Sequence, residues 1–322
     1  MNTLHFILKS RLKNSKLVQK SGGFTLIELL VALVIAFLIL TPLLGFMVNV
    51  LTTDQQEQAK ASVEDDIQTA TNYIARDLQQ AIYIYDAAGI AAVASQLLYP
   101  SDTTKTPILV FWKRNLVTNV VSSATSGSND DTFVYSLVAY YLDTSTSTTW
   151  SKAARISRWE IKDGVPSIAG VLCEGYTNKY VSGNCPDPGF TPFNDYFTGT
   201  DSLSAGMQKW RKGSTSYNTE DAKVLIDFVD QSTSSVPAAT CPTNTTATTT
   251  TPATTWSQIP ATASITGFYA CVETVSDSTA QIYIRGNALA RTTASSISYS
   301  NSNKSYFPTT SIRVQGRGYL YK

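Results

Sequence analysis

Histidine is almost missing from this 322-residue sequence. The one histidine, His5, lies in a basic N-terminal segment, so the chain beyond that segment has no imidazole. This excludes Ser-His-Asp and Cys-His catalytic sites there, together with zinc or iron sites that need histidine. The four cysteines form no C-x-x-C pair. We therefore expect neither a metal nor a cofactor.

Charged residues are also scarce, at 15% of the sequence against about 25% in a typical soluble domain. The formal net charge of +1 conceals an uneven distribution. Residues 1–23 contain no acidic residue and five basic ones: Lys9, Arg11, Lys13, Lys16 and Lys20. The rest of the chain is slightly acidic, and so nucleic acid is not an expected partner.

A long apolar run follows the basic segment. Between residues 24 and 51 the only charged residue is Glu28. As a helix the run would be about 42 Å long at ~1.5 Å per residue, enough to cross the ~30 Å hydrocarbon core of a membrane. The basic residues before it predict a cytoplasmic N-terminus and an external remainder. A secretory signal peptide would have an apolar region about half as long.

The residues around Gly23 resemble a known processing signal. Gly23 is followed by FTLIELL, which puts Glu28 in the fifth place after the glycine. This pattern resembles the prepilin cleavage motif of type IV pilins and type II secretion pseudopilins. The resemblance implies that a prepilin peptidase removes residues 1–23 as a leader, and that the new N-terminal residue, Phe24, is N-methylated.

Glu28 is unusual because a carboxylate in a membrane-spanning helix costs at least ~2.5 kcal/mol and therefore needs a partner. The resemblance implies that Glu28 pairs with the Phe24 amine of a neighbouring subunit when a filament assembles. The alternative is an ordinary membrane anchor in which Glu28 occurs by chance.

We expect the N-terminal helix to cover residues 24–88, with its transmembrane part at about 24–48. No glycine or proline occurs between residues 46 and 88. The apolar spacing there is typical of an amphipathic helix with one face on a core. That face is formed by Val63, Ile67, Ala70, Ile74, Leu78 and Ala81. Pro42, with Gly45 close by, predicts a kink or melted turn in the apolar half.

Residues 89–322 form the predicted extracytoplasmic head. Strand patterns occur at residues 108–112, 133–142, 156–161, 223–229, 265–273, 281–287 and 311–320. Antiparallel pairing is favoured because no second long helical pattern supplies parallel crossovers. The predicted fold class is α+β and pilin-like, with a long N-terminal helix packed on an antiparallel β-sheet head that has long Ser/Thr-rich loops.

The cysteines and a low-complexity segment predict how the head is stabilised. Residues 232–264 are rich in serine and threonine, contain no charge, and bury too little apolar surface to order fully. We favour a surface loop there over a glycosylated stalk. Two disulfides in an oxidising compartment are expected. Pairing Cys173 with Cys185 and Cys241 with Cys271 would close a short loop and clamp this segment, but the two other pairings stay open.

Three further groups of side chains offer alternative sites. Asp187, Asp195 and Asp201 could supply oxygens to calcium, although their spacing is irregular. A membrane-anchored hydrolase would need a carboxylate pair, and no spacing singles one out among Glu160, Glu174, Asp227 and Glu273. Several aromatic residues fill a sheet core or line a glycan-binding surface, and we favour the core. They are Tyr83, Tyr85, Tyr140, Tyr141, Trp159, Tyr269 and Tyr283.

Residues 41–51, 75–85, 285–291 and 308–318 are similar to one subgroup, the cyanobacterial hormogonium polysaccharide secretion pseudopilins. This implies a minor pilin-like subunit, not an enzyme, that supports polysaccharide secretion and gliding motility. Its partners would be the prepilin peptidase, other pilins or pseudopilins, an inner-membrane assembly platform and membrane lipid. It would span the inner membrane once, with its head in the periplasm, before it enters a filament. The alternatives are a J-like minor pseudopilin of type II secretion and a minor pilin of a twitching pilus.

Overall fold

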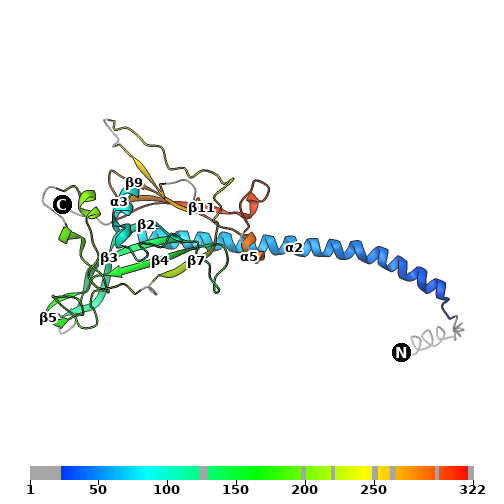
Figure 1. Cartoon of the computed structure of the whole chain (residues 1–322), viewed down its shortest axis with the longest axis horizontal. Helices are drawn as coiled ribbons and strands as arrows, with labels where there is room; N and C mark the ends of the chain where they lie inside the picture. Colours follow the sequence, from blue (N-terminus) through cyan, green and yellow to red (C-terminus); the bar gives the residue numbers. More distant parts are fainter. Residues whose placement is uncertain are drawn as a thin grey trace, which may run out of the picture. The chain divides into compact units, whose positions relative to one another are not determined.

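The computed structural model describes residues 23–122, 129–196, 201–218, 222–248, 253–261, 266–293 and 297–317 (Figure 1). Its contacts divide the chain into two units, Met1–Thr53 and Asp54–Lys322. The expected leader, up to residue 22, lies outside the described residues. Helix α2 (Leu26–Leu78) begins in the first unit and ends in the second.

The second part of α2 is amphipathic, as its apolar spacing predicts. One face is buried in the head, at Ala59, Val63, Ile67, Ala70, Thr71, Ile74, Ala75, Asp77 and Leu78. The exposed face carries acidic and amide side chains. The predicted core-facing stripe is thus confirmed up to Leu78, while Ala81 is buried in a strand instead.

The helix ends at Leu78, and the expected end at residue 88 is therefore wrong. Strand β1 (Ala81–Ile84) follows, with all four residues buried and paired antiparallel with the next strand. Its isoleucines and tyrosine fit a strand better than a helix, and the pairing ends α2 without a glycine or proline. Asp86 then begins helix α3 (Ala87–Val93) by accepting a hydrogen bond from the Gly89 N–H.

The first sheet has five antiparallel strands in the order β1-β2-β3-β4-β7 (Figure 1). The four longer strands contain the first four predicted segments: β2 (Lys105–Ser122), β3 (Asn129–Asp143), β4 (Ala154–Lys162) and β7 (Lys223–Val229). One face packs on α2. On the other face, Trp112 contacts the rings of Phe190 and Trp210, and Trp159 contacts Tyr217. The core interpretation is confirmed for six of the seven aromatic residues named above, which are buried, whereas Tyr283 is half-buried and stacks on Tyr269.

The second sheet has four antiparallel strands in the order β11-β10-β9-β8. They are β8 (Trp256–Ile259), β9 (Phe268–Glu273), β10 (Thr279–Arg285) and β11 (Thr309–Gln315). The last three confirm predicted strands with shifted ends, although residues 265 and 318–320 lie outside the described part. Strand β8 lies in the Ser/Thr-rich segment, so the segment expected to form a surface loop contains one short strand.

Short elements complete the head. They are a 3-10 turn η1 (Ala94–Gln96), β5 (Pro166–Leu172), β6 (Lys179–Tyr180), η2 (Phe193–Tyr196), α4 (Leu203–Gln208), α5 (Leu289–Thr292) and η4 (Lys304–Tyr306). Strands β5 and β6 pair with each other outside the two main sheets.

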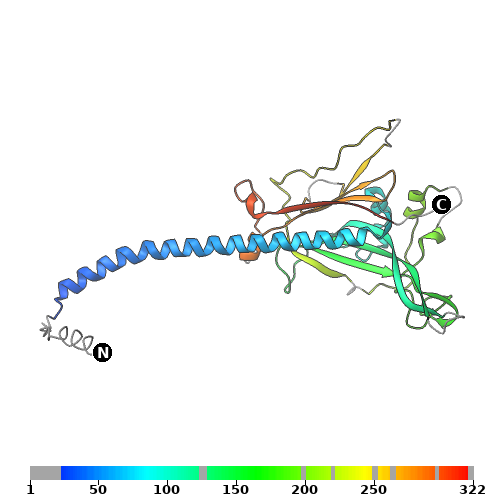
Figure 2. The same ribbon diagram turned by 180° about the vertical axis from the view of Figure 1, so that it is seen from behind.

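Strand β10 and the residues after it connect the second sheet to the first sheet and to α2. Val229 of β7 forms an antiparallel bridge with Gly286. The buried Arg285 Nε donates to Asp230 Oδ2 at 2.7 Å. In Figure 2, β11 lies along the second part of α2, where Thr310 Oγ1 donates to Gln68 Oε1 at 3.2 Å.

Gly286 lies close against α2 in this connection. A Cβ atom there would lie 2.3 Å from Val63 Cγ1 and 3.4 Å from Ile67 Cγ2 of α2. Any side chain at this position would therefore push the second sheet away from the helix.

We expect Gly286→Ala to destabilise the full-length protein in detergent by about 1–3 kcal/mol, the usual cost of an overpacked core. Val63→Ala removes the clashing methyl group, so the double variant should lose less than the sum of the single losses by at least about 0.5 kcal/mol. Gly45→Ala is the control, because a Cβ there meets nothing within 4 Å. Urea unfolding followed by tryptophan fluorescence measures the stability of wild type and of the four variants. Strictly additive losses in the double variant would refute the contact.

Candidate functional site

The start of α2 is a capped helix end. Thr25 precedes the first helical residue, and its Oγ1 accepts a hydrogen bond from the Glu28 N–H at 3.3 Å. Thr25 and Glu28 thus have the spacing of a Ser/Thr-x-x-Glu capping box. The positive end of the helix dipole also favours a carboxylate in the first turn. Glu28 therefore has a local role at the helix start as well as the role that the resemblance implies.

The motif residues Gly23, Phe24 and Glu28 are all exposed in the single chain. Phe24 keeps 81% of its surface, and a Cβ atom at Gly23 would meet nothing within 4 Å. The Glu28 carboxylate makes no hydrogen bond or ion pair with another described residue. The part of the chain that the structure describes thus places no steric demand for glycine at position 23 and supplies no partner for the Glu28 carboxylate.

The first part of α2 is apolar on all sides. Residues 23–55 are exposed, and large side chains such as Phe24, Leu26, Leu38 and Phe46 each keep at least 70% of their surface. The helix is long and apolar enough to cross a membrane by length and composition. An apolar surface around a whole helix is stable only in lipid or among other helices.

Residues 18–44 match the prokaryotic N-terminal methylation motif. This motif is the signature of prepilins and pseudopilins, and with the long helix and the antiparallel head it gives the chain a pilin-like α+β organisation. It implies membrane anchoring, processing by a prepilin peptidase and assembly with other pilins, which are structural proteins. No curated protein and no solved structure matches the chain.

Helix α2 runs without interruption through Pro42 and Gly45. Of the kink or melted turn expected there, the melted turn is therefore not present, and the kink stays a prediction. Because Pro42 has no backbone N–H, the carbonyl of residue 38 lacks its usual helical hydrogen bond. In the same turn, Thr41 Oγ1 donates to the Phe37 carbonyl at 2.8 Å.

The last turn of α2 is bound to the first sheet by a buried charged cluster that the sequence analysis did not identify. Asp77 Oδ1 accepts from Lys113 Nζ on β2 at 2.8 Å. Asp77 Oδ2 accepts from the Tyr140 hydroxyl on β3 and from Arg158 Nε on β4, both at 2.8 Å. Glu160 closes the cluster by pairing with Lys113 at 3.2 Å and with Arg158 at 2.7 Å.

The charges in this cluster compensate one another. Burial alone would raise the pKa of Asp77, but the hydrogen bond and charge of Arg158, together with Lys113, hold it below the usual value. Two carboxylates face two cations, so the cluster is neutral and each charge has a partner. Removing one partner would leave a buried, uncompensated charge.

The two disulfides link Cys173 to Cys185 and Cys241 to Cys271, with Cα–Cα distances of 5.8 and 5.6 Å. Of the three possible pairings, this is the one named above, which closes a short loop and clamps the Ser/Thr-rich segment. Cys271 lies on β9, and the second disulfide therefore fastens the Ser/Thr-rich segment to the second sheet. Within the same segment, Asn244 Oδ1 accepts a hydrogen bond from the backbone N–H of Trp256, at the start of β8, at 2.9 Å.

The other candidate side chains have structural partners. Asp187 Oδ2 accepts from the Lys162 N–H, and Asp201 pairs with Lys209; the side chain of Asp195 lies outside the described part. Among the described residues no group of three or more acidic, Cys or His side chains could hold a metal ion.

The carboxylates considered for a hydrolase are also held locally. Glu160 belongs to the charged cluster, Asp227 accepts from Ser151, and Glu273 accepts from the backbone N–H groups of Val275 and Ser276. Glu174 is exposed.

Asp77→Asn should lower the stability of the full-length protein at pH 7 by about 3–5 kcal/mol, because it leaves buried cations without their partner. The folded-state pKa of Asp77 is lowered, so its contribution is present above the unfolded value of about 3.9 and is lost as the pH falls through the folded value. The difference between wild type and variant should therefore shrink below about pH 4.

Urea unfolding from pH 3 to pH 8 measures this difference, with Asp130→Asn on the exposed hairpin as the control. Asp277 has the opposite dependence, since burial, Asp86 and Glu273 raise its pKa to about 7. Asp277 is present in wild type and in both variants, so its contribution cancels when their stabilities are compared. A gap between wild type and Asp77→Asn that is the same at every pH would contradict the charge pairing.

Proposed function

We propose that this chain is a minor pilin-like subunit, a pseudopilin, of a filament of the type IV pilus or type II secretion kind. The observation that carries the proposal is the methylation motif at the start of a helix whose first part is apolar on all sides and whose second part is buried in a folded head. Such a chain can be held in a membrane and later exchange lipid for the helices of neighbouring subunits.

The motif residues receive roles through this proposal. A prepilin peptidase cuts after Gly23, and the new amine of Phe24 is methylated. The exposed carboxylate of Glu28 then pairs with the Phe24 amine of a neighbour in the filament. A charge-assisted contact of this kind is roughly twice as strong as a neutral one, and more so away from water.

The orientation follows from the basic leader. Its five basic residues keep the N-terminus in the cytoplasm, so the head lies in the periplasm until the subunit enters a filament. The two disulfides support this location, because disulfides persist in oxidising compartments.

The cargo and activity of the filament are proposed on the narrower resemblance. Four stretches similar to the cyanobacterial pseudopilins support a role in polysaccharide secretion and gliding motility. The competing roles are a J-like subunit of type II protein secretion and a minor pilin of a twitching pilus. We propose no enzymatic activity, since the carboxylates Glu160, Asp227 and Glu273 are bound by neighbouring groups.

Glu28→Gln tests the proposal in a strain that lacks the native gene. The variant should be processed and retained in the membrane with a normally folded head, but its incorporation into filaments should fall roughly ten- to a hundredfold, because one charge-assisted contact of about 1.5–3 kcal/mol is lost. Polysaccharide export and gliding should fall with it. Quantitative blotting of sheared filaments against membranes gives the ratio.

Glu57→Gln is the matched control, because Glu57 lies on the same helix beyond the apolar part and pairs only weakly with Lys60, at 3.9 Å. It should enter filaments normally. Normal incorporation of Glu28→Gln would refute the pairing role. A defect confined to protein secretion or twitching would assign the filament to one of the competing systems.

A further inference from the structure

A hollow lies between the second part of α2 and strand β7. Its volume is about 510 Å³, and it is lined by Asp65, Asp66 and Tyr73 of the helix, by Asp227 and Phe228 of β7, and by Trp150 from the loop between β3 and β4. All of these residues belong to the unit Asp54–Lys322. The hollow is separate from the methylation motif, and its Tyr73 ring lies 5.9 Å from the guanidinium of Arg158 in the charged cluster around Asp77.

Two large aromatic side chains at this hollow are only half covered. Trp150 keeps 44% of its surface and Tyr73 keeps 45%, whereas Trp112, Trp159 and Trp210 are fully buried. A half-exposed tryptophan beside a hollow is the kind of side chain that dominates the binding energy of protein interfaces.

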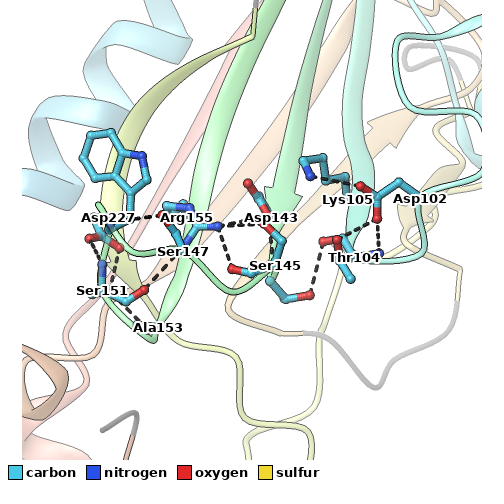
Figure 3. A network of polar contacts seen from close by, with 12 residues as sticks. Asp102, Thr104, Lys105, Asp143, Ser145, Ser147, Ser151, Ala153, Arg155 and Asp227 are labelled. Carbon is cyan, nitrogen blue, oxygen red and sulfur yellow. Dashed lines mark hydrogen bonds and ion pairs between the residues drawn. The ribbon is translucent and has the colours of Figure 1, made fainter. Parts of the chain in front are cut away.

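The loop that carries Trp150 is held in place by a polar network (Figure 3). At one end the buried Arg155 donates to the Ser145 carbonyl at 2.7 Å and pairs with Asp143 at 3.2 Å. At the other end Asp227 accepts from the Ser151 N–H at 2.8 Å and from its hydroxyl at 2.7 Å. These bonds therefore hold the loop backbone around Trp150 before any partner binds, which reduces the entropy cost of binding.

Within the loop, the Ser147 hydroxyl oxygen accepts from the Trp150 N–H at 3.2 Å and from the Thr149 N–H at 3.1 Å. The backbone next to the indole is thus bonded on both sides of the turn. None of these bonds covers the indole ring, so Trp150 is held at its backbone while its side chain stays exposed.

The rim of the hollow is acidic. It carries three carboxylates against one guanidinium, that of Arg291, which pairs with Asp66. Asp227 accepts a hydrogen bond from the Ser151 hydroxyl. Asp65 is exposed and forms no ion pair with another described residue. A net negative rim beside aromatic faces attracts a cation, through ion pairing and through the electron-rich ring faces.

We propose that this hollow is a docking site for a polypeptide segment of a partner protein that inserts a lysine or arginine between Asp65 and the ring of Trp150. An apolar side chain of the same segment would pack on Leu225, which also lines the hollow, beside the Phe228 ring that the Arg291 guanidinium covers. The inference goes beyond the proposed function, because it assigns a binding partner to a surface of the head that the methylation motif does not involve.

The test is a photo-crosslink in the full-length chain in its host membrane, with p-benzoylphenylalanine in place of Thr69, an exposed residue that lines the hollow, so that Trp150 and Asp65 stay intact. Mass spectrometry should identify an adduct with a peptide that contains a lysine or arginine next to the crosslinked residue. Asp65→Lys should reduce the adduct about fivefold or more, the upper range for one exposed charge pair. Glu64→Lys is the matched control, since Glu64 is exposed on the same helix turn but does not line the hollow.

Reversing the charge of the identified partner base, to glutamate, should restore the adduct with Asp65→Lys. An adduct from a second copy of this chain supports the proposal if its peptide carries the base and shows the same charge dependence. Four results would overturn it: no adduct, an adduct with a glycan, a peptide without a basic residue, or equal yields in Asp65→Lys and Glu64→Lys. Unchanged protease resistance of each variant establishes that the head is folded.

Discussion

The buried charged cluster around Asp77 is the interaction on which the arrangement of the head depends. Asp77 lies in the last turn of α2 and bonds to side chains on three successive strands. Apolar packing is non-directional, and a helix can slide on a sheet at modest cost. Buried charges must all be paired, so only one position of the helix along the sheet satisfies them. The cluster therefore sets the register in which the rest of the head packs.

That register explains features far from the cluster. It brings Val63 against Gly286, where only a glycine fits, and it places the acidic face of α2 opposite the loop that carries Trp150. The same helix also suits two different surroundings. Its surface is apolar on all sides over residues 26–51, whereas beyond Asp54 only one face is buried in the head. One continuous helix thus combines a membrane segment with the central element of a soluble core.

Local patterns made much of this structure predictable. The apolar run, the motif at Gly23, the buried stripe of the helix and the strand at residues 223–229 are each encoded by neighbouring residues. Strand β1 was not predictable, because no glycine or proline marks the end of α2. The helix ends there because the following residues pair with β2. The partners of Asp77 were not predictable either, because Lys113 and Arg158 lie 36 and 81 residues away in the sequence. Asp77 falls on the buried stripe between Ile74 and Leu78, which was the available sign of a buried partner.

The central claim is that the mature protein begins at Phe24 as a methylated, membrane-held subunit. The most direct measurement is the intact mass of the protein purified from membranes under non-reducing conditions, with sequencing of its N-terminal peptide. The account predicts a chain that starts at Phe24, carries one additional methyl group on its amine and has two disulfides. A chain that retains residues 1–23, or that begins at another residue, would contradict it.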